Sequence, residues 1–257
     1  MWYRFITYLR FLWRSTNQHG IHSPFVFDLV TKCFYSKTKY ADYKKLNTYR
    51  ASLLEDNTII HIHDLGAGSK AMKSTKRMVS SIAKNSGTTH KRAQLLCRLS
   101  NYFQVHNVLE LGTSLGIGTY ALSLGSPKAK ITSIEGCSNI TAFTKARLIK
   151  EGLEKINLLE GDFDQHLPVL LSNKFDIIFF DGNHQKEATI NYFKTLLPTT
   201  HNNTLFIFDD IYWSRGMTAA WDAIKQHPKI TVSIDTYFWG LVFFRKEQQK
   251  QHFTIRI

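Results

Sequence analysis

Cysteine is scarce in this sequence, and its few copies are scattered. The 257 residues include three cysteines, Cys33, Cys97 and Cys137, and no CxxC pair. This spacing excludes a cysteine-rich zinc site and a disulfide framework, both of which need paired or numerous cysteines. Because 43% of the residues are hydrophobic, the chain can bury a full core without such crosslinks. The cysteine usage is typical of a reducing compartment, and we expect a cytoplasmic location.

Long hydrophobic runs are also missing. No apolar stretch approaches the roughly 20 residues that a membrane-spanning helix requires. The aromatic N-terminus is interrupted by Arg4, Arg10 and Arg14 and has no secretion-signal cleavage site. The spacing of these arginines predicts an amphipathic helix over residues 1–14, with a broad apolar face and a narrow basic stripe. Such a helix would pack on the main domain, pack on a second subunit of a homodimer, or lie on a membrane surface.

Acidic residues are nearly absent from the first part of the chain. Residues 1–109 contain 17 lysines and arginines against 5 acidic residues, a net charge of +12, whereas the remainder has 16 against 15. The stretch from Leu65 to Leu109 contains no acidic residue, and Lys70, Lys73, Lys76 and Arg77 lie within it. This part is either a solvated basic face or a docking surface for nucleic acid or an anionic membrane.

From Asn107 onward, short apolar runs alternate with helical patterns. Such alternation predicts an α/β fold with a parallel sheet covered on both faces. Two further runs flank Trp239-Gly240 and read as an antiparallel hairpin. The expected architecture is a Rossmann-like, doubly wound, mostly parallel seven-stranded sheet ending in that hairpin, over 107–257, behind a basic, mainly helical N-terminal extension or cap over 1–106. The predicted strands are 108–111, 131–135, 156–161, 175–181, 204–210, 231–238 and 241–246, and the predicted helices lie near 119–124, 137–152, 164–171, 185–197 and 215–226.

The segment VLELGTSLGIG, residues 108–118, joins the first of these strands to a helix through a glycine-rich turn. Gly112 and Gly116 permit a tight turn and a close approach of the backbone to a ligand. Amides at the start of the following helix would face that ligand. A carboxylate ends the next strand at Glu135, and Asp162 follows the third strand. A carboxylate in the position of Glu135 can accept two hydrogen bonds from a vicinal diol.

This series resembles the first motifs of class I S-adenosylmethionine-dependent methyltransferases. The resemblance implies that Glu110 supports the methionine end of the cofactor, that Glu135 binds the ribose hydroxyls and that Asp162 contacts the adenine edge. It also assigns cofactor binding to the turn residues and their neighbours. The full cofactor-binding set comprises Glu110, Gly112, Thr113, Ser114, Gly116, Glu135, Gly136, Asp162 and Asp181.

Two other glycine-rich segments compete with this interpretation. GIGTYA, residues 116–121, matches a dinucleotide-binding pattern but does not follow its strand directly, as that pattern requires. DLGAGS, residues 64–69, also follows an apolar stretch, but no acidic residue comes after it for the next forty residues. We interpret the second segment as a turn or a cap element.

Carboxylates follow the fourth and fifth predicted strands. Asp181 ends one of these strands, and Asp209 and Asp210 end the other. Parallel strands direct their carboxyl ends to one edge of the sheet, where ligands bind. Three converging carboxylates would repel one another unless a hard divalent cation such as Mg²⁺ lay between them. The alternative is structural, because aspartates also cap helices and begin turns.

FFDGNH and FIFDDIYW resemble the strand ends of divalent-metal-dependent O-methyltransferases, and the DGxH form resembles a further methyltransferase family whose substrates vary. In the former the second pair is Asp-Asn, whereas here it is Asp-Asp, which leaves the metal open. The resemblance implies Asp181, Asp209 and Asp210 as metal ligands. It covers about residues 107–246. We predict Asp181, His184 and Asp210 as the catalytic residues, with His184 a general base if no metal binds.

Aromatic and histidine residues near these motifs allow two interpretations each. Tyr212 and Trp213 would form a wall for the methyl acceptor or pack under their loop. His19 and His22 would belong to a cap over the pocket rather than to the catalytic set.

The sequence therefore predicts a methyltransferase that uses S-adenosylmethionine, with Mg²⁺ or another divalent cation, to methylate an oxygen of a small molecule. Neither the NPPY or DPPY motif nor the Pro-Cys nucleophile motif is present, which disfavours N-methylation and 5-methylcytosine chemistry by those families. Two alternatives stay open. The first is an RNA methyltransferase that docks through the basic N-terminal part. The second is a non-catalytic binding protein on a degenerate cofactor fold.

Overall fold

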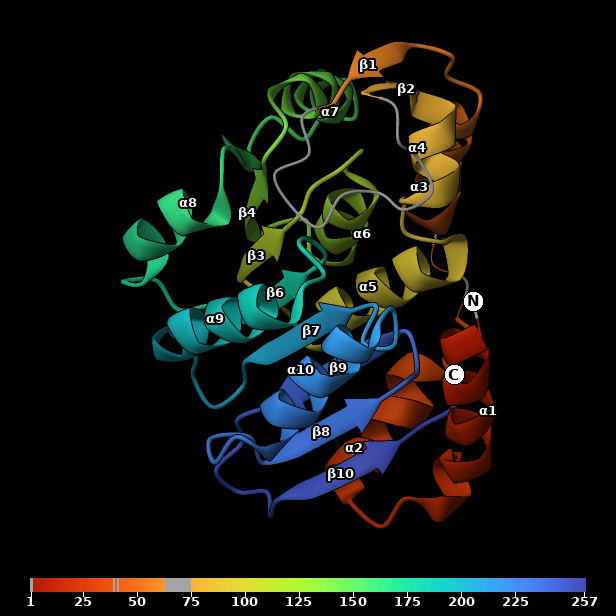
Figure 1. Ribbon diagram of the computed structural model, residues 1–257, viewed down its shortest axis with the longest axis vertical. Helices are drawn as coiled ribbons and strands as arrows, with labels where there is room; N and C mark the ends of the chain where they lie inside the picture. The colour runs from red at the N-terminus through yellow and green to blue at the C-terminus, as the bar shows by residue number, and fades with distance from the viewer. Residues whose placement is uncertain (1, 39, 41, 63–74) are drawn as a thin grey trace. The chain divides into compact units, whose positions relative to one another are not determined.

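The computed structural model describes residues 2–38, 40, 42–62 and 75–257 (Figure 1). The chain divides into two compact units, which we treat separately. One unit combines Met1–Ser36 with Leu167–Ile257, and the other is Lys37–His166. DLGAGS, Lys70 and Lys73 lie outside the described residues, so the interpretations that rest on them are not tested. The division predicted between 106 and 107 stays a prediction.

The Lys37–His166 unit contains three parallel strands in the order β3-β4-β5. In β3 the half-exposed Asn107 is followed by four consecutive buried residues, as expected for a strand covered on both faces. A separate antiparallel pair, β1 and β2, precedes them. The elements are α3 (Asp42–Leu54), β1 (Ile59–His61), β2 (Lys76–Met78), α4 (Val79–Asn85), α5 (His90–Tyr102), β3 (Asn107–Leu111), α6 (Ile117–Gly125), β4 (Lys130–Glu135), α7 (Ser138–Lys150) and β5 (Asn157–Glu160).

The other unit contains five strands in the order β10-β8-β9-β7-β6. α8 (Phe163–Leu170) contains the point where the chain enters this unit for the second time. The elements are α1 (Trp2–Arg14), η1 (Gln18–Gly20), α2 (Pro24–Leu29), η2 (Val30–Phe34), β6 (Ile177–Phe180), α9 (Lys186–Leu196), η3 (Leu197–Thr199), β7 (Leu205–Asp209), α10 (Arg215–Gln226), β8 (Val232–Asp235), β9 (Trp239–Phe243) and β10 (Gln251–Thr254).

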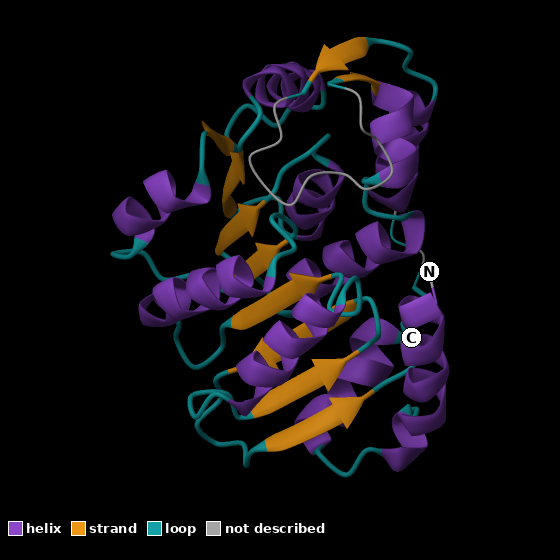
Figure 2. Cartoon of the chain, viewed as in Figure 1, coloured by secondary structure: helices purple, strands orange, loops and turns teal. Residues whose placement is uncertain are grey.

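Helices cover both faces of this five-stranded part. Gly240 on β9 faces the Trp221 ring of α10, and a Cβ at Gly240 would lie 2.5 Å from that ring. Phe243, three residues along the same strand and therefore on the opposite face, packs edge-on against Phe25 of α2 at 5.1 Å between ring centroids. α9 packs beside α10 (Figure 2). These contacts on its two faces explain why β9 (WGLVF) is buried along its whole length.

The fold prediction is confirmed, with one correction in strand count. β8 and β9 pair antiparallel, as predicted for the terminal hairpin. Its turn, however, lies before Trp239 rather than at Trp239-Gly240, because Trp239 pairs with Asp209 as the first residue of β9. Within the described residues, eight strands replace the seven predicted for this fold, since β10 pairs parallel with β8. The predicted N-terminal helix is observed as α1.

Segments from the two ends of the chain meet in this unit. The backbone amide of Thr16 donates to the carbonyl oxygen of Thr254 at 2.9 Å, and the Tyr35 hydroxyl donates to the carbonyl oxygen of Arg256. In Figure 1, the red α1 and α2 lie beside the blue strands β8 and β10. Residues 1–36 are therefore built into the same core as the C-terminal strands.

Candidate functional site

The turn after β3 is held in a left-handed backbone conformation. Gly112 has φ 103° and Gly116 has φ 74°, and Ser114 between them has φ 46°. The Gly112 amide donates to the Ile134 carbonyl at 2.9 Å, which ties the turn to β4. A Cβ on Gly116 would approach Thr144 Cγ2 to 2.8 Å. Gly116 is the N-cap residue of α6, and no side chain caps the start of this helix. The amides of Gly112, Thr113, Ser114 and Gly116 all donate within the chain, so the turn is fixed in shape and leads into the uncapped start of α6.

Glu135 lies at the end of β4, and its carboxylate faces this turn. Its Oε2 accepts a hydrogen bond from the Ser114 amide at 2.8 Å, and its Oε1 accepts one from the Cys137 amide at 3.0 Å. Each carboxylate oxygen has a further lone pair, so these bonds leave acceptor capacity for a diol. Gly136 follows and is half-buried. The arrangement fixes the Glu135 side chain in advance of ligand binding.

Glu110 is buried within the same unit. Ser133 donates to its Oε2 at 2.6 Å, and the Thr119 hydroxyl donates to the same oxygen. Thr113 in turn bonds Ser133 at 2.6 Å. Burial raises the pKa of Glu110 to about 7, even though both hydroxyl donors act in the opposite direction. Glu110 thus ties β3, β4 and α6 together below the turn.

Asp162 follows β5 and is half-buried. Its Oδ1 accepts a hydrogen bond from the Asp164 amide at 3.1 Å, which is an aspartate turn at the start of α8. The role predicted for it, contact with the adenine edge, stays a prediction. The Lys37–His166 unit therefore contains all the predicted cofactor residues except Asp181.

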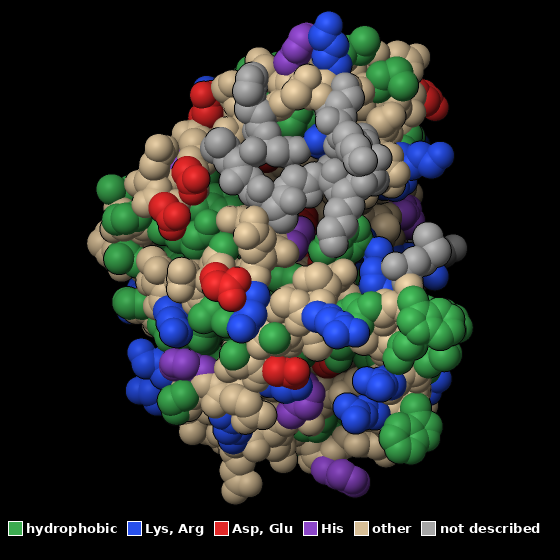
Figure 3. All heavy atoms as spheres, in the orientation of Figure 1, with side chains coloured by type: hydrophobic (Ala, Val, Ile, Leu, Met, Phe, Trp, Pro, Cys, Tyr) green, Lys and Arg blue, Asp and Glu red, His purple; other side chains and the backbone are tan. Residues whose placement is uncertain are grey.

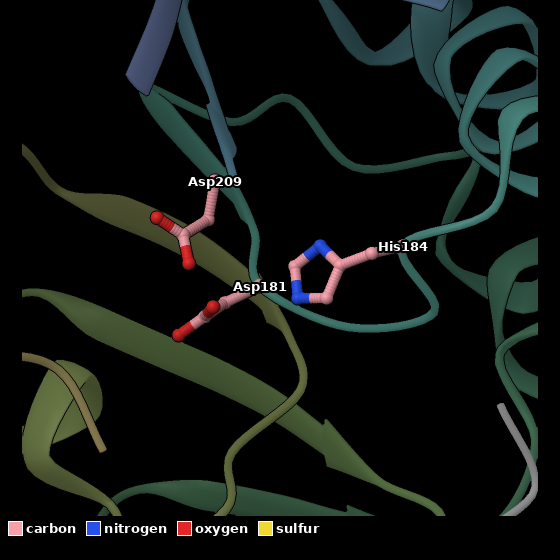
Figure 4. Close-up of side chains that lie close together, drawn as sticks. All are labelled: Asp181, His184 and Asp209. Atoms are coloured by element: carbon pink, nitrogen blue, oxygen red, sulfur yellow. The ribbon is translucent and has the colours of Figure 1, made fainter. Parts of the chain in front are cut away.

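The other unit brings together Asp181, His184 and Asp209 (Figure 4). Asp181 follows β6, His184 lies in the loop before α9, and Asp209 ends β7. One ligand atom from each of the three lies within 4.8 Å of the others. Asp181 and His184 are half-exposed and Asp209 is buried. Two carboxylates and an imidazole at this spacing form a group that can hold a divalent cation.

The orientation of Asp209 is set by a tryptophan. Trp239 lies opposite Asp209 across the β7–β9 pair, and its Nε1 donates to Asp209 Oδ1 at 2.6 Å. The Trp239 ring also packs edge-on against Phe179 at 5.7 Å. This residue was not predicted as part of the site. In the sequence, Trp239 can be recognised only as the first residue of an apolar strand after a turn. That pattern does not indicate which residue lies opposite it in the sheet.

Asp210, which was predicted as a ligand and a catalytic residue, is not a member of this group. Asp210 has φ 53°, and its carbonyl accepts a hydrogen bond from the Trp213 amide at 2.8 Å. The group that can hold a metal ion contains His184 in its place. Asn183, next to His184, also has a left-handed φ of 52°, and within the described part of the chain its buried Oδ1 has no hydrogen-bond partner. The DGNH loop is therefore strained beside the group.

The aromatic loop after β7 is packed against α1. The Tyr212 hydroxyl donates to Asp235 Oδ2 at 2.5 Å, and its ring stacks on Tyr237 at 5.1 Å. The Arg4 guanidinium lies 4.7 Å from the centroid of Trp213. Both aromatic residues thus have structural partners, which favours the second of the two interpretations that the sequence left open for them.

Part of the sequence is similar to known methyltransferases. Residues 109–211 match a methyltransferase domain family. The catechol O-methyltransferase of Mycobacterium tuberculosis is 24% identical over 134 residues, which cover 51% of this chain and 60% of that protein. The chain thus spans about three fifths of the length of this curated relative. Residues 109–211 of this chain are thus similar to methyltransferase domains.

Solved structures of methyltransferases share the fold of this domain. The SAH-bound methyltransferase PaMTH1 of Podospora anserina superposes with a TM-score of 0.60 at 15% identity, covering 88% of this chain and 98% of its own. The O-methyltransferase TomG of Streptomyces achromogenes, in complex with SAM, gives a TM-score of 0.57 at 14% identity, covering 84% and 95%. The sequence-based identification of a class I methyltransferase fold is confirmed.

Proposed function

We propose that the chain is an S-adenosylmethionine-dependent O-methyltransferase that acts on a small hydroxylated molecule with the help of a divalent cation. The observation that carries this proposal is the Asp181–His184–Asp209 group at the ends of two strands of a methyltransferase domain. The curated relative is named for catechol, and structural neighbours are named as O-methyltransferases. We extend that acceptor class, an ortho-dihydroxy aromatic, to this chain as the first to test.

The residues of the Lys37–His166 unit fit the cofactor. The turn from Gly112 to Gly116 leads into the uncapped start of α6, and Glu135 is held by two backbone amides in a position to accept hydrogen bonds from ribose hydroxyls. Glu110 is buried and accepts hydrogen bonds from Ser133 and Thr119, and we keep for it the support of the methionine end of the cofactor. Gly112, Thr113, Ser114, Gly116, Gly136 and Asp162 complete the proposed binding set.

The donor atoms of the other unit fit a divalent cation. We assign Asp181, His184 and Asp209 as its protein ligands, with the Trp239 indole orienting Asp209 from behind. A set containing an imidazole suits Mn²⁺, Fe²⁺ or Zn²⁺ as well as Mg²⁺, which prefers oxygen ligands. When bound, such a cation lowers the pKa of a hydroxyl that it contacts.

The proposed reaction transfers a methyl group from the sulfonium sulfur of the cofactor to an oxygen of the acceptor. The acceptor hydroxyl gives up its proton, its oxygen forms a bond to the methyl carbon, and the bond from that carbon to the sulfonium sulfur breaks to leave S-adenosylhomocysteine. The sulfonium is already activated, so the chain has to bind and orient the acceptor and favour the loss of its proton. A cytoplasmic location stays our expectation, based on the few, scattered cysteines of the sequence.

The test measures cofactor binding and catalysis separately. Calorimetry should show micromolar binding of S-adenosylmethionine, about −8 kcal/mol, and Glu135→Ala should weaken it. With catechol as the acceptor, Asp209→Asn should lower kcat by about 100-fold, a size typical of lost electrostatic stabilisation, and leave cofactor affinity unchanged. Asp222→Asn, an exposed aspartate on α10, is the matched control.

Three outcomes would contradict parts of the proposal. Binding of NAD without binding of S-adenosylmethionine would remove the methyltransferase assignment. Full activity in excess chelator would remove the cation and leave His184 as the general base. Cofactor binding without methylation of catechol or related hydroxylated acceptors would remove the acceptor class.

A further inference from the structure

The inner face of α1 is built into the unit that contains it. Thr7 and Phe11 are buried, the Tyr237 hydroxyl donates to the Arg4 carbonyl at 2.6 Å, and the Tyr3 hydroxyl donates to Thr218 Oγ1 at 2.7 Å. These contacts fix the helix on the domain and determine which side chains point outward. The side chains on the opposite face of α1 are exposed.

That opposite face is also hydrophobic. Trp2, Phe5, Leu9 and Trp13 are 74%, 53%, 49% and 87% exposed. At 100° per residue they fall within one narrow sector, on the far side of the helix from Thr7 and Phe11. Figure 3 shows hydrophobic side chains gathered over α1 at the right-hand edge, with lysine or arginine side chains nearby. We call these four residues the outer stripe. Two exposed tryptophans on one short helix are unusual for a surface that meets only water.

The charged side chains of α1 itself are all arginines. At 100° per residue the exposed Arg10 borders the stripe, 60° around the helix from Trp13, and the exposed Arg14 follows Trp13 in the last turn, closer to the inner face. Arg4 lies on the inner side, over the Trp213 ring. Residues 1–27 contain no acidic residue, the first being Asp28. A partner that covers the stripe therefore meets the Arg10 guanidinium at its border and Arg14 at the end of the helix, with no carboxylate on α1 to balance them, and an anionic partner matches this charge.

We propose that α1 is a membrane-surface helix that inserts the outer stripe into the headgroup region of an anionic lipid bilayer. Tryptophan and phenylalanine prefer the interface between headgroups and acyl chains, and adjacent arginines contact lipid phosphates. α1 has 13 residues, about 20 Å of helix at 1.5 Å per residue, too short to span a bilayer and long enough to lie along it. No described helix is long and apolar enough to cross a membrane.

A second copy of the chain fits this surface less well. In a two-fold symmetric contact the stripe would face itself, and each copy would bring the arginines of α1 into the contact without any carboxylate of that helix. The helix and the 13 residues after it offer no carboxylate to pair with them. A phospholipid surface supplies the hydrophobic layer and the negative charge together.

The experiment uses the full chain and two kinds of vesicle, phosphatidylcholine alone and phosphatidylcholine mixed with phosphatidylserine. We expect co-sedimentation with the mixed vesicles that weakens as salt is added. Tryptophan emission should shift to the blue on binding, because Trp2 and Trp13 are exposed while Trp221 and Trp239 are already buried.

Two double variants divide the proposal into its parts. Trp2→Ala with Trp13→Ala, and Arg10→Glu with Arg14→Glu, should each lower vesicle affinity by about tenfold or more. The matched controls, Ile59→Ala with Val169→Ala and Lys145→Glu with Lys150→Glu, change exposed residues of the same kinds on other elements and should bind as the unmodified chain does.

Equal binding to both kinds of vesicle, or unchanged binding by the arginine variant, would overturn the role of anionic lipid. Absence of vesicle binding together with a dimer that the tryptophan variant dissociates would overturn the proposal in favour of a second copy. Catalytic activity is measured beside these assays, so failure of the membrane proposal and failure of the methyltransferase proposal give different results.

Discussion

Gly116 and Gly152 have a similar backbone conformation but differ in the space that a side chain would find around them. Both have a left-handed backbone, with φ 74° and 77°. A Cβ on Gly152 would meet nothing within 4 Å, whereas on Gly116 it would meet Thr144 Cγ2 at 2.8 Å. Gly152→Ala should therefore cost only the left-handed penalty of about 1–2 kcal/mol.

We expect Gly116→Ala to cost clearly more and to weaken S-adenosylmethionine binding as well, because the turn must shift to relieve the contact with Thr144. Urea unfolding and calorimetry on the two variants measure both effects. Equal destabilisation by the two substitutions, with unchanged cofactor affinity, would show that the packing at Gly116 does not matter.

Glu110 gives the protein a pH dependence of known sign. Its pKa is raised from 4.5 to about 7 in the folded chain, mainly by burial. Between these values the unfolded chain loses this proton and the folded chain keeps it, so stability should fall as pH rises through the interval. The difference corresponds to about 3 kcal/mol at most.

Glu110→Gln should remove this part of the pH dependence, while Glu154→Gln, an exposed residue, should leave it in place. Unfolding free energies measured at about pH 5 and about pH 8 give the comparison. A slope that is the same in all three proteins would mean that Glu110 ionises normally in the folded state.

At the scale of elements, α1 presents two faces with different energetic roles. Phe11 is buried and packs near Tyr237, with 5.5 Å between ring centroids. Phe11→Ala should destabilise the chain by about 3 kcal/mol, the usual cost of truncating a buried aromatic residue. Trp13→Ala, on the exposed side, should change stability by less than about 0.5 kcal/mol. Thermal unfolding of the pair tests this, and a large loss for Trp13→Ala would show that the outer stripe is covered within the chain.

The strands and helices that pair locally were predictable from the sequence. Apolar runs gave β3, β4, β6 and β7 to within two residues, and the glycine-rich turn lies where expected. β10 was missed because QHFT has no apolar run, and its place depends on pairing with β8, about twenty residues earlier.

The candidate site was predictable only in part, for a similar reason. Asp181 and Asp209 follow from strand ends, which sequence patterns locate well. His184 and Asp210 depend on loop conformations, and the left-handed backbone at Asn183 and Asp210 decides which side chain joins the group. The buried hydroxyls of Ser133 and Thr119, which hold Glu110, break apolar patterns but do not reveal their partner.

At the scale of the whole molecule, three buried thiols report on the two units. Cys33 belongs to the unit that contains both chain ends, and Cys97 and Cys137 belong to the Lys37–His166 unit. Burial raises the pKa of Cys97 to about 11, so its native thiol should react slowly. Cys97 and Cys137 should become reactive to iodoacetamide with the same dependence on urea, because one compact unit opens as a whole.

The measurement is alkylation followed by mass spectrometry of peptides, with the fully unfolded chain as the reference for intrinsic reactivity. Different urea dependences for Cys97 and Cys137 would mean that the Lys37–His166 unit opens in parts. The dependence of Cys33 gives the stability of the other unit independently.

The meeting of residues 1–36 with the last strands also has a consequence for synthesis on the ribosome. The aromatic partners of Phe11 and Phe25, which are Tyr237 and Phe243, are translated more than 200 residues after the α1–η2 segment. At about 5–20 residues per second, this segment waits for ten seconds or more, roughly, with its aromatic side chains exposed. The Lys37–His166 unit, a continuous stretch of chain, can fold during that interval. Nascent α1 is therefore a natural binding site for chaperones, and the last strand to leave the ribosome competes with them for it.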